Sequence, residues 1–217
     1  MKLEYVCLTL GPLSNNVYLL GNLDTGDAAV IDPGFESEAV LAASEKTGWK
    51  IRQIWLTHGH FDHIAGAALI ASTVSPPLPV GLHPEDFTWY QSGGGAGKFG
   101  LSMPQLPPVS IQFKPGMMLS LTEGLPPVVH VLFAPGHSPG HVMFYCEPLG
   151  VLFCGDVIFR EGVGRTDLIG GNWKTLMTSI RNQVLTLPDE TRLLSGHGPE
   201  TTVSYERENN PFLGTGW

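Results

Sequence analysis

The sequence of 217 residues contains 42% hydrophobic and 15% charged residues, which describes a globular protein able to bury a sizeable core. Its formal net charge of −8 disfavours nonspecific binding to nucleic acid or to an anionic membrane surface, so neither partner is expected. The sequence has no apolar run of about 18 residues and no secretory signal, and its three cysteines form no disulfide or zinc-ribbon pattern, so we expect a cytoplasmic protein.

The first half of the chain is predicted to open as an antiparallel meander and to continue with alternating helices and strands. Apolar runs separated by Gly, Pro and Asn predict the strands, and Ser37 is placed to cap the first helix. The predicted strands cover residues 3–10, 17–20, 28–31, 51–56 and 80–82, and the predicted helices cover residues 37–46, 62–73 and 84–90.

Residues 92–108 contain too many glycines and prolines for regular structure and include the run Gly93-Gly94-Gly95-Ala96-Gly97. A loop of this length inside a domain is usually either a functional lid or a disordered excursion, and both interpretations stay open. The glycines follow no predicted strand and lack the Lys-Ser/Thr ending of a P-loop, so the loop does not predict nucleotide binding.

The second half repeats the strand-rich style of the first. Its apolar runs are short and bounded by Pro and Gly, and one longer segment has leucine, isoleucine and valine spaced by four residues. Two halves that each combine strands with helices predict two sheets packed face to face with helices outside, within a single domain over residues 1–217. The predicted strands cover residues 117–121, 128–134, 142–146, 151–154 and 193–195, and the predicted helix covers residues 173–185.

The segment Thr57-His58-Gly59-His60-Phe61-Asp62-His63 is the strongest functional signal in the chain. It places three imidazoles and one carboxylate directly after an apolar strand. Neutral imidazole is the commonest protein ligand for zinc and iron, and carboxylate joins it where hard metals or bound water are involved. The segment therefore predicts a metal site.

Three further strand ends carry the same kind of side chain. In each, a glycine ends an apolar run and the next residue is His137, Asp156 or His197. Strand ends held by a sheet position side chains well, and the glycine leaves the backbone free beside a metal. The other histidines are not predicted to be ligands, because His83 precedes a helix start, His130 points to solvent, and His141 has a packing or outer-sphere role.

The order His58-x-His60-x-Asp62-His63, then His137, Asp156 and His197, resembles the signature of the metallo-β-lactamase-fold hydrolases over almost the whole chain. This resemblance implies an α+β fold, a four-layer αββα sandwich of two mixed β-sheets. It also implies two divalent metal ions, zinc by preference, with iron or manganese as alternatives. The first metal would be held by His58, His60 and His137, the second by Asp62, His63 and His197, and Asp156 would bridge both.

Within that family the chain resembles the glyoxalase II (hydroxyacylglutathione hydrolase) branch, in a compact form without the C-terminal helical domain. The resemblance implies hydrolysis of a small-molecule thioester such as S-lactoylglutathione, or another glutathione conjugate, by a metal-bridging hydroxide that Asp62 orients as a catalytic residue. It rests on two segments, which are Gly136-His137-Ser138-Pro139-Gly140-His141 and Phe153-Cys154-Gly155-Asp156-Val157-Ile158-Phe159 with its continuation to Gly171. The ending Gly196-His197-Gly198-Pro199-Glu200-Thr201-Thr202, with residues 206–213, resembles compact bacterial relatives of that enzyme.

Two cationic side chains are candidates for binding the substrate. Arg165 falls where the glyoxalase II pattern carries a basic residue that meets glutathione, and guanidinium suits a bidentate contact with carboxylate. A structural pairing of Arg165 with Asp167 is the alternative, and Arg160 is a weaker candidate. Lys98, beside the glycine-rich loop, is in position to reach the substrate from a lid.

Several other functions stay open. A persulfide dioxygenase of the same fold would use one iron held by His58, His137 and Asp156. A lactonase, another ester hydrolase, a phosphodiesterase and a flavodiiron protein also stay open, although no flavodoxin-like domain follows the last predicted ligand. A dedicated B1-type β-lactamase is disfavoured because no cysteine stands among the second-metal ligands. A non-catalytic metal-binding module is disfavoured because both carboxylates, Asp62 and Asp156, are present.

Overall fold

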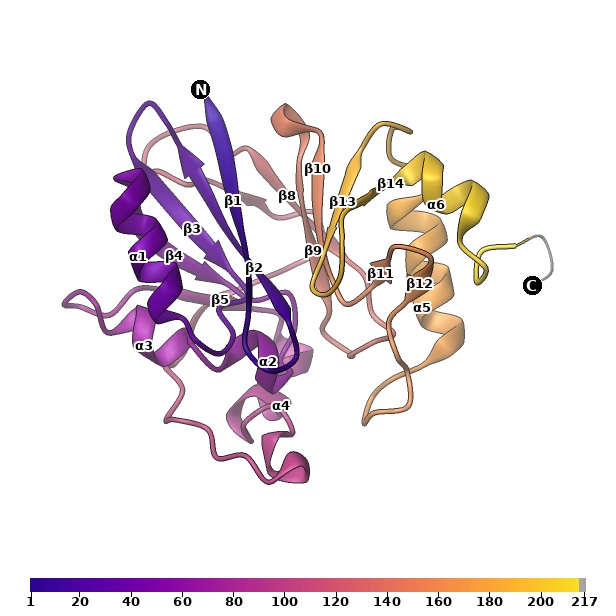
Figure 1. The fold of residues 1–217 in the computed structure, drawn as a ribbon, viewed down its shortest axis with the longest axis horizontal. Coiled ribbons are helices and arrows are strands. Elements are labelled where there is room, and N and C mark those ends of the chain that lie inside the picture. Colours follow the sequence, from indigo (N-terminus) through magenta and orange to yellow (C-terminus); the bar gives the residue numbers. More distant parts are fainter. Residues whose placement is uncertain (215–217) are drawn as a thin grey trace.

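The computed structural model describes residues 1–214, and its first sheet is built from the N-terminal half of the chain (Figure 1). The six strands lie in sequence order from β1 to β6. The strands β1, β2 and β3 form the predicted antiparallel meander, whereas β3 to β6 pair in parallel, so the sheet is mixed. The strands are β1 (Leu3–Leu10), β2 (Asn15–Asn22), β3 (Asp27–Ile31), β4 (Lys50–Trp55), β5 (Val80–Leu82) and β6 (Val109–Gln112).

The second sheet comes from the C-terminal half and has the strand order β14-β13-β10-β9-β8-β7. Only the β10–β13 pair within it is parallel among the described residues, so this sheet is also mixed. A separate hairpin pairs β11 (Ile158–Phe159) with β12 (Gly162–Val163). The sheet strands are β7 (Met118–Leu119), β8 (Val129–Phe133), β9 (Val142–Cys146), β10 (Val151–Gly155), β13 (Arg192–Ser195) and β14 (Thr201–Thr202).

Three apolar cores show that the layers are stacked as helix, sheet, sheet and helix. The fully buried strand β2 alternates between two of them, because successive side chains of a strand point to opposite faces. Val17 and Leu19 face the core beneath α1 and α3, while Tyr18 and Leu20 face the core between the sheets. A third core packs α5 and α6 on the second sheet. The helices are α1 (Glu38–Thr47), α2 (Phe61–Ile64), α3 (Ala67–Ala71), α4 (Phe87–Gln91), α5 (Trp173–Ser179) and α6 (Val203–Asn209).

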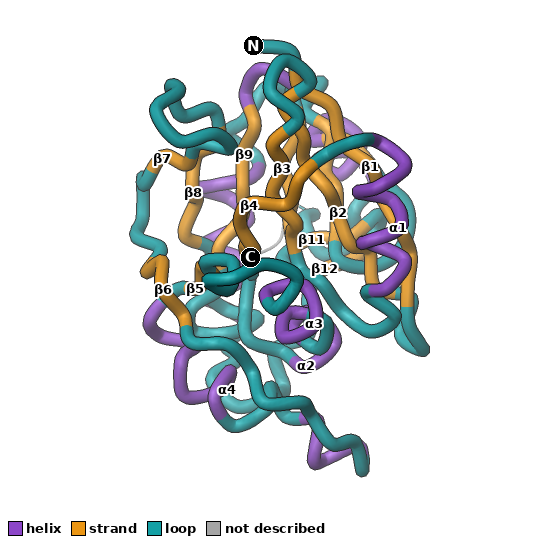
Figure 2. Tube along the Cα trace, turned by 90° about the vertical axis from the view of Figure 1, so that its left-hand side faces the viewer, coloured by secondary structure: helices purple, strands orange, loops and turns teal. Residues whose placement is uncertain are grey.

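This arrangement confirms the predicted αββα sandwich of two mixed sheets with helices outside. In Figure 1 the helices α1 and α3 flank the first sheet, while α5 and α6 flank the second. The short helices α2 and α4 lie beyond one end of the first sheet in both views (Figures 1 and 2). In the part of the chain that the structure describes, no helix has the length and apolar character needed to span a membrane.

The predicted helix over residues 62–73 is wrong in its continuity, because it is divided into α2 and α3. The N–H of Gly66 donates to the carbonyl of Pro33 at 2.8 Å, so it does not continue the helical ladder to Asp62. Gly66 also packs so closely on Ser37 that a Cβ atom there would clash. The break keeps Asp62 in a single-turn helix directly after the His-rich turn.

Other boundaries also differ from those that the sequence predicts. The Ser37 hydroxyl donates to the carbonyl of Gly34 at 2.8 Å, so it does not cap α1. The strand predicted over residues 117–121 is only the two-residue β7, and β6, β14, α6 and the β11–β12 hairpin were not predicted. The helix predicted over residues 173–185 is α5 followed by a π-helical turn (Ile180–Val184), and that over residues 84–90 is a 3₁₀ turn (Pro84–Asp86) followed by α4.

Candidate metal centre

The first predicted donor set is assembled from both sheets. His58 and His60 come from the turn after β4, and His137 comes from the turn between β8 and β9. The Nε2 of His58 lies 3.0 Å from Nδ1 of His60, and Nε2 of His137 lies 2.8 Å from the same Nδ1 and 3.2 Å from Nε2 of His58. Three nitrogens bound to one tetrahedral zinc ion at 2.0–2.1 Å lie about 3.3 Å apart, so this buried triangle has the dimensions of a metal site.

The second donor set combines α2 with the turn after β13. Nε2 of His197 lies 3.2 Å from Oδ2 of Asp62, and Nε2 of His63 lies 3.7 Å from the same oxygen. The three donor atoms lie within 4.8 Å of one another. This second group can therefore hold another ion beside the first.

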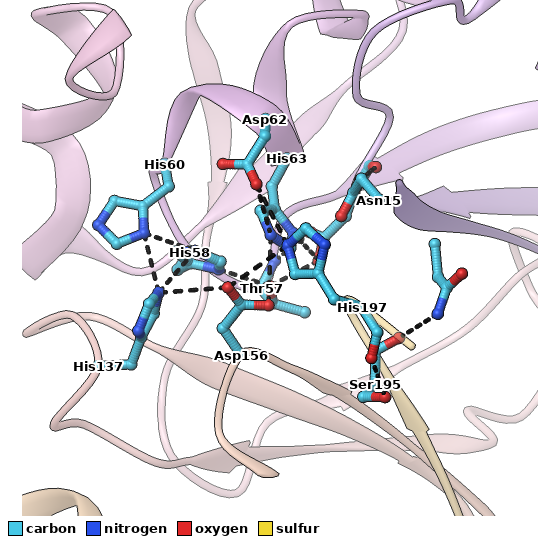
Figure 3. Close-up of polar contacts among 12 residues, drawn as sticks. Asn15, Thr57, His58, His60, Asp62, His63, His137, Asp156, Ser195 and His197 are labelled. Carbon is cyan, nitrogen blue, oxygen red and sulfur yellow. Dashed lines mark hydrogen bonds and ion pairs between the residues drawn. The ribbon is translucent and has the colours of Figure 1, made fainter. Parts of the chain in front are cut away.

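Asp156, at the end of β10, lies between the two sets (Figure 3). Its Oδ1 is 3.4 Å from Nε2 of His63, and its Oδ2 is 3.6 Å from Nε2 of His137 and 3.7 Å from Nε2 of His197. One carboxylate thus contacts ligands of both sets. Oδ1 of Asp156 and Nε2 of His63 are buried without a hydrogen-bond partner among residues 1–214, which a bound cation would supply.

Hydrogen bonds to backbone carbonyls fix the tautomers of two of these histidines. Nδ1 of His137 donates to the carbonyl of Arg165 at 2.8 Å, and Nδ1 of His197 donates to the carbonyl of Leu13 at 3.0 Å. A proton on Nδ1 leaves the lone pair of Nε2 directed at the centre, and such outer partners orient metal ligands. Both imidazoles are thereby prepared to bind a cation.

Asp32, which directly follows β3, does the same for His58 and His63. Its Oδ2 accepts from Nδ1 of His63 at 2.9 Å and from the hydroxyl of Thr57 at 2.6 Å. That hydroxyl then accepts from Nδ1 of His58 at 3.0 Å. One buried carboxylate therefore orients one ligand of each set.

The imidazoles of the first set are held neutral. Burial lowers the pKa of His58 well below its usual value, and the neighbouring histidines lower it further. Burial and the adjacent His137 lower the pKa of His60 to about 3, and burial lowers the pKa of His137. Neutral imidazole is the form that coordinates metal, so this set is ready to bind without losing protons.

In the second set, charged neighbours outweigh burial in setting the pKa values. Burial alone would lower the pKa of His63, but Asp156, Asp62 and Asp32 together raise it well above its usual value. Burial alone would raise the pKa of Asp156, because it disfavours the charged carboxylate, but His63 and His137 hold this pKa below its usual range. The carboxylates are therefore ionised and His63 carries a proton. A divalent cation bound here would displace that proton, and the negative charge of the carboxylates favours the cation.

Three outer residues complete the centre, and sequence reasoning identified only one of their roles. His141 accepts the N–H of Asp156 on Nε2 at 3.0 Å, which is the predicted outer-sphere role. Asp32 directly follows the strand predicted over residues 28–31, as the ligands follow theirs, but no role was predicted for it from the sequence. Asp86 lies in a segment predicted only as a helix, and no sequence signal pointed to its buried carboxylate. His83 caps the 3₁₀ turn and His130 is partly exposed, as predicted.

A pocket of about 480 Å³ opens onto the centre. Arg165 lies on its wall with its guanidinium paired to both carboxylate oxygens of Asp167 at 2.7 and 2.8 Å, and the ammonium of Lys98 lies 5.6 Å from the ring centroid of Trp89. A second hollow of about 740 Å³, between α4 and residues 101–109, touches none of the donor residues. The pocket of about 480 Å³ is lined by Leu13, His60, Phe61, Asp62, Trp89, Gly94, Gly95, Lys98, Phe99, His137, Asp156, Phe159, Val163, Arg165, Leu168 and His197.

The glycine-rich loop forms one wall of this pocket. The N–H of Phe61, next to Asp62, donates to the carbonyl of Gly94 at 3.1 Å. The hydroxyl of Tyr90 donates to the carbonyl of Pro107 at 2.8 Å and joins the two ends of the loop. These contacts place the loop over the centre, where a lid would lie, and its movement stays a prediction.

Comparison with protein families identifies the fold family. The model of the metallo-beta-lactamase superfamily matches residues 10–197 of the chain. The chain belongs to the metallo-beta-lactamase superfamily. The match includes all seven predicted ligand positions, from His58 to His197.

Curated members of the superfamily resemble the chain over most of its length. It is 39% identical over 212 residues to the probable metallo-hydrolase YqgX of Bacillus subtilis, which covers 95% of each chain. It is 35% identical over 191 residues to the hydroxyacylglutathione hydrolase GloC of Haemophilus influenzae, covering 88% of this chain and 89% of that protein. The second relative supports the predicted glyoxalase II-like branch.

Solved structures of the superfamily agree with the fold and the centre. TTHA1623 in a di-iron-bound form is 42% identical, with a TM-score of 0.86 and coverage of 96% of this chain and 100% of that one. The BLEG-1 B3 metallo-beta-lactamase is 37% identical, with a TM-score of 0.89 and coverage of 98% and 100%. Superfamily membership supports a metal-dependent hydrolase, and the donor cluster together with the di-iron relative supports a dinuclear metal site.

Proposed function

We propose that the protein hydrolyses a small-molecule thioester, such as S-lactoylglutathione, as a hydroxyacylglutathione hydrolase of glyoxalase II type. The observation that carries the proposal is the position of Asp156, whose two oxygens face histidines of both donor sets beside a pocket of substrate size. The identity with the hydroxyacylglutathione hydrolase GloC supports the thioester as the bond that is cleaved. The proposed metals are zinc, and the same donors accept iron or manganese.

The side chains present fit two-metal hydrolysis. His58, His60 and His137 would hold one cation and Asp62, His63 and His197 the other, with Asp156 shared. Two divalent cations bound there would supply a water of lowered pKa and would polarise the carbonyl of the substrate. Asp62, whose pKa is lowered by His63 and His197 against the effect of burial, is ionised and would accept a hydrogen bond from this water and so orient it. A thiolate is a good leaving group, so no strong general acid is needed.

The first test is a substrate panel with and without metal. We expect the purified protein to hydrolyse S-lactoylglutathione, to lose this activity after chelation, and to regain it with zinc, iron or manganese, because the donors bind each of these ions. The panel includes a lactone, a β-lactam and glutathione persulfide, with oxygen uptake recorded for the last. Elemental analysis of the same sample gives the metal and its stoichiometry.

Each competing function has its own outcome in this panel. One iron per chain with oxygen uptake on glutathione persulfide would replace the proposal with a persulfide dioxygenase. Cleavage of the lactone or the β-lactam with an inert thioester would assign the same centre to a lactonase or a β-lactamase. Stable metal binding without turnover of any substrate would indicate a non-catalytic module.

The two cationic side chains of the pocket, Lys98 and Arg165, are predicted to differ in their contribution to substrate binding. Arg165 is already paired with Asp167, so a contact with a substrate carboxylate would require exchange of one partner for another. We expect Lys98→Ala to raise KM for S-lactoylglutathione several-fold, and Arg165→Ala to raise it less, with little change in kcat in either variant. Lys114→Ala, which removes an exposed ammonium outside the pocket, is the control. A larger KM effect at Arg165, or none at either residue, would contradict this assignment.

A further inference from the structure

The carboxylate of Asp86 joins the two turns that carry the first donor set. Asp86 is fully buried. Its Oδ2 accepts the N–H of Gly59 at 2.9 Å and the hydroxyl of Ser138 at 2.7 Å, and its Oδ1 accepts the N–H of Gly140 at 2.6 Å. Gly59 separates His58 from His60, and Ser138 directly follows His137.

We propose that Asp86 is a positioning residue that sets the distance between the two halves of the first metal site. The two turns belong to different sheets, so the separation of their imidazoles depends on whatever connects them. The backbone connects them once, where the N–H of Val142 donates to the carbonyl of Thr57 at 2.8 Å. Asp86 adds three hydrogen bonds, to Gly59, Ser138 and Gly140, which lie beside the ligands in the two turns. Hydrogen bonds of this outer kind govern the affinity of a metal site.

The backbone around Asp86 is shaped for this role. Two of its three bonding partners are glycines, and a Cβ atom on Gly140 would lie 2.7 Å from the amide nitrogen of Asp86 and 2.8 Å from its Oδ1. A Cβ atom on Gly59 would lie 3.2 Å from the carbonyl oxygen of Asp86. Asp86 itself is fixed by the 3₁₀ turn, in which its N–H donates to the carbonyl of His83 at 3.1 Å. Both turns therefore donate hydrogen bonds to the carboxylate and pack closely on the residue that carries it. This indicates that the carboxylate determines the spacing of the turns.

The second donor set depends on other partners. His63 is oriented by Asp32, and His197 is oriented by the carbonyl of Leu13. The side-chain bonds of Asp86 go to the turns of the first set. A change at Asp86 should therefore weaken one metal site and leave the other intact. The inference rests on the proposed metal centre and is independent of the bond that the protein hydrolyses.

The test is Asp86→Asn in two backgrounds that each retain one donor set. His197→Ala leaves the first set complete, and His60→Ala leaves the second set complete. Metal-free protein is titrated with Zn²⁺ against a chromophoric chelator, without substrate. Because the amide NH₂ faces at least one of the three donors, we expect the Zn²⁺ affinity to fall by roughly 10- to 100-fold in the His197→Ala background. In the His60→Ala background we expect less than a threefold change.

Glu206→Gln is the matched control, because Glu206 is also a fully buried carboxylate with three donors but lies on α6. We expect it to leave the Zn²⁺ affinity unchanged in both backgrounds. Ser138→Ala removes one donor to Asp86 and tests the same contact if Asp86→Asn does not fold, with a smaller loss in the same direction. The donors to Glu206 are the hydroxyl of Thr201, the N–H of Glu161 and the amide of Asn210, at 2.6, 2.9 and 2.7 Å.

Several results would overturn the inference. Unchanged affinity in the His197→Ala background, for Asp86→Asn or for Ser138→Ala where only that variant folds, would show that the turns keep their spacing without this contact. Equal losses in both backgrounds, or an equal loss in Glu206→Gln, would show a general structural effect. Failure of thioester turnover in the unsubstituted protein would overturn the proposed function alone, because the Zn²⁺ titration contains no substrate.

Discussion

Replacing Asp156 with asparagine is expected to lower the proposed thioester hydrolysis by about 10³-fold, equivalent to roughly 4 kcal/mol of transition-state stabilisation. The reason is its position, since one oxygen faces His63 and the other faces His137 and His197. The amide keeps the shape of the side chain but removes its negative charge and one acceptor oxygen. Both metal sites should therefore weaken together, which steady-state kinetics and elemental analysis of the same sample would measure.

Asp62→Asn is the matched comparison for this prediction. Asp62 also carries a carboxylate beside the centre, but its contacts are with His63 and His197 of the second set. We expect this variant to retain one metal ion per chain, where Asp156→Asn retains less than one. Two metals and wild-type turnover in Asp156→Asn would rule out the sharing of this carboxylate between the sites.

The sequence was sufficient to predict two packed sheets with helices outside and the seven donor residues of the centre. Strand ends are readable because an apolar run stops at a glycine, and His137, Asp156 and His197 each follow such a glycine. Residue type then indicated the chemistry, and the resemblance supplied the division into two sets. The structure brings all seven predicted donors together, although their roles as ligands stay proposed.

What the sequence did not reveal depends on contacts between distant segments. In the sequence, Asp32 and Asp86 look like ordinary turn residues. In the fold, their carboxylates accept the N–H groups of Thr57, Gly59 and Gly140. The division of the predicted helix at Gly66 has a similar origin, because the N–H of Gly66 donates to the carbonyl of Pro33 in an earlier loop. Two-residue strands such as β7 and β14 contain too few residues for a periodicity.

Removing the metals is expected to destabilise the protein as well as inactivate it. The donors stand at the ends of β4, β10 and β13 and in the turn after β8, so bound cations connect the two sheets at this edge. An ion held at 1,000 times its dissociation constant, and bound only by the folded state, stabilises that state by about 4 kcal/mol. For a chain of this size, 1 kcal/mol shifts the unfolding midpoint by about 2–4 °C. Chelation should therefore lower the midpoint by about 8–16 °C for each ion lost.

The size of this shift shows whether the metals stabilise the fold or contribute to catalysis alone. Nε2 of His63 and Oδ1 of Asp156 are buried without a hydrogen-bond partner in the described chain, so an empty centre leaves polar groups unsatisfied. Thermal unfolding followed by circular dichroism, before chelation, after chelation and after return of Zn²⁺, measures the effect. The His197→Ala variant, which lacks the complete second set, should show about half the shift. An identical midpoint with and without metal would mean that the two sheets hold this edge without help, and that the cations contribute chemistry alone.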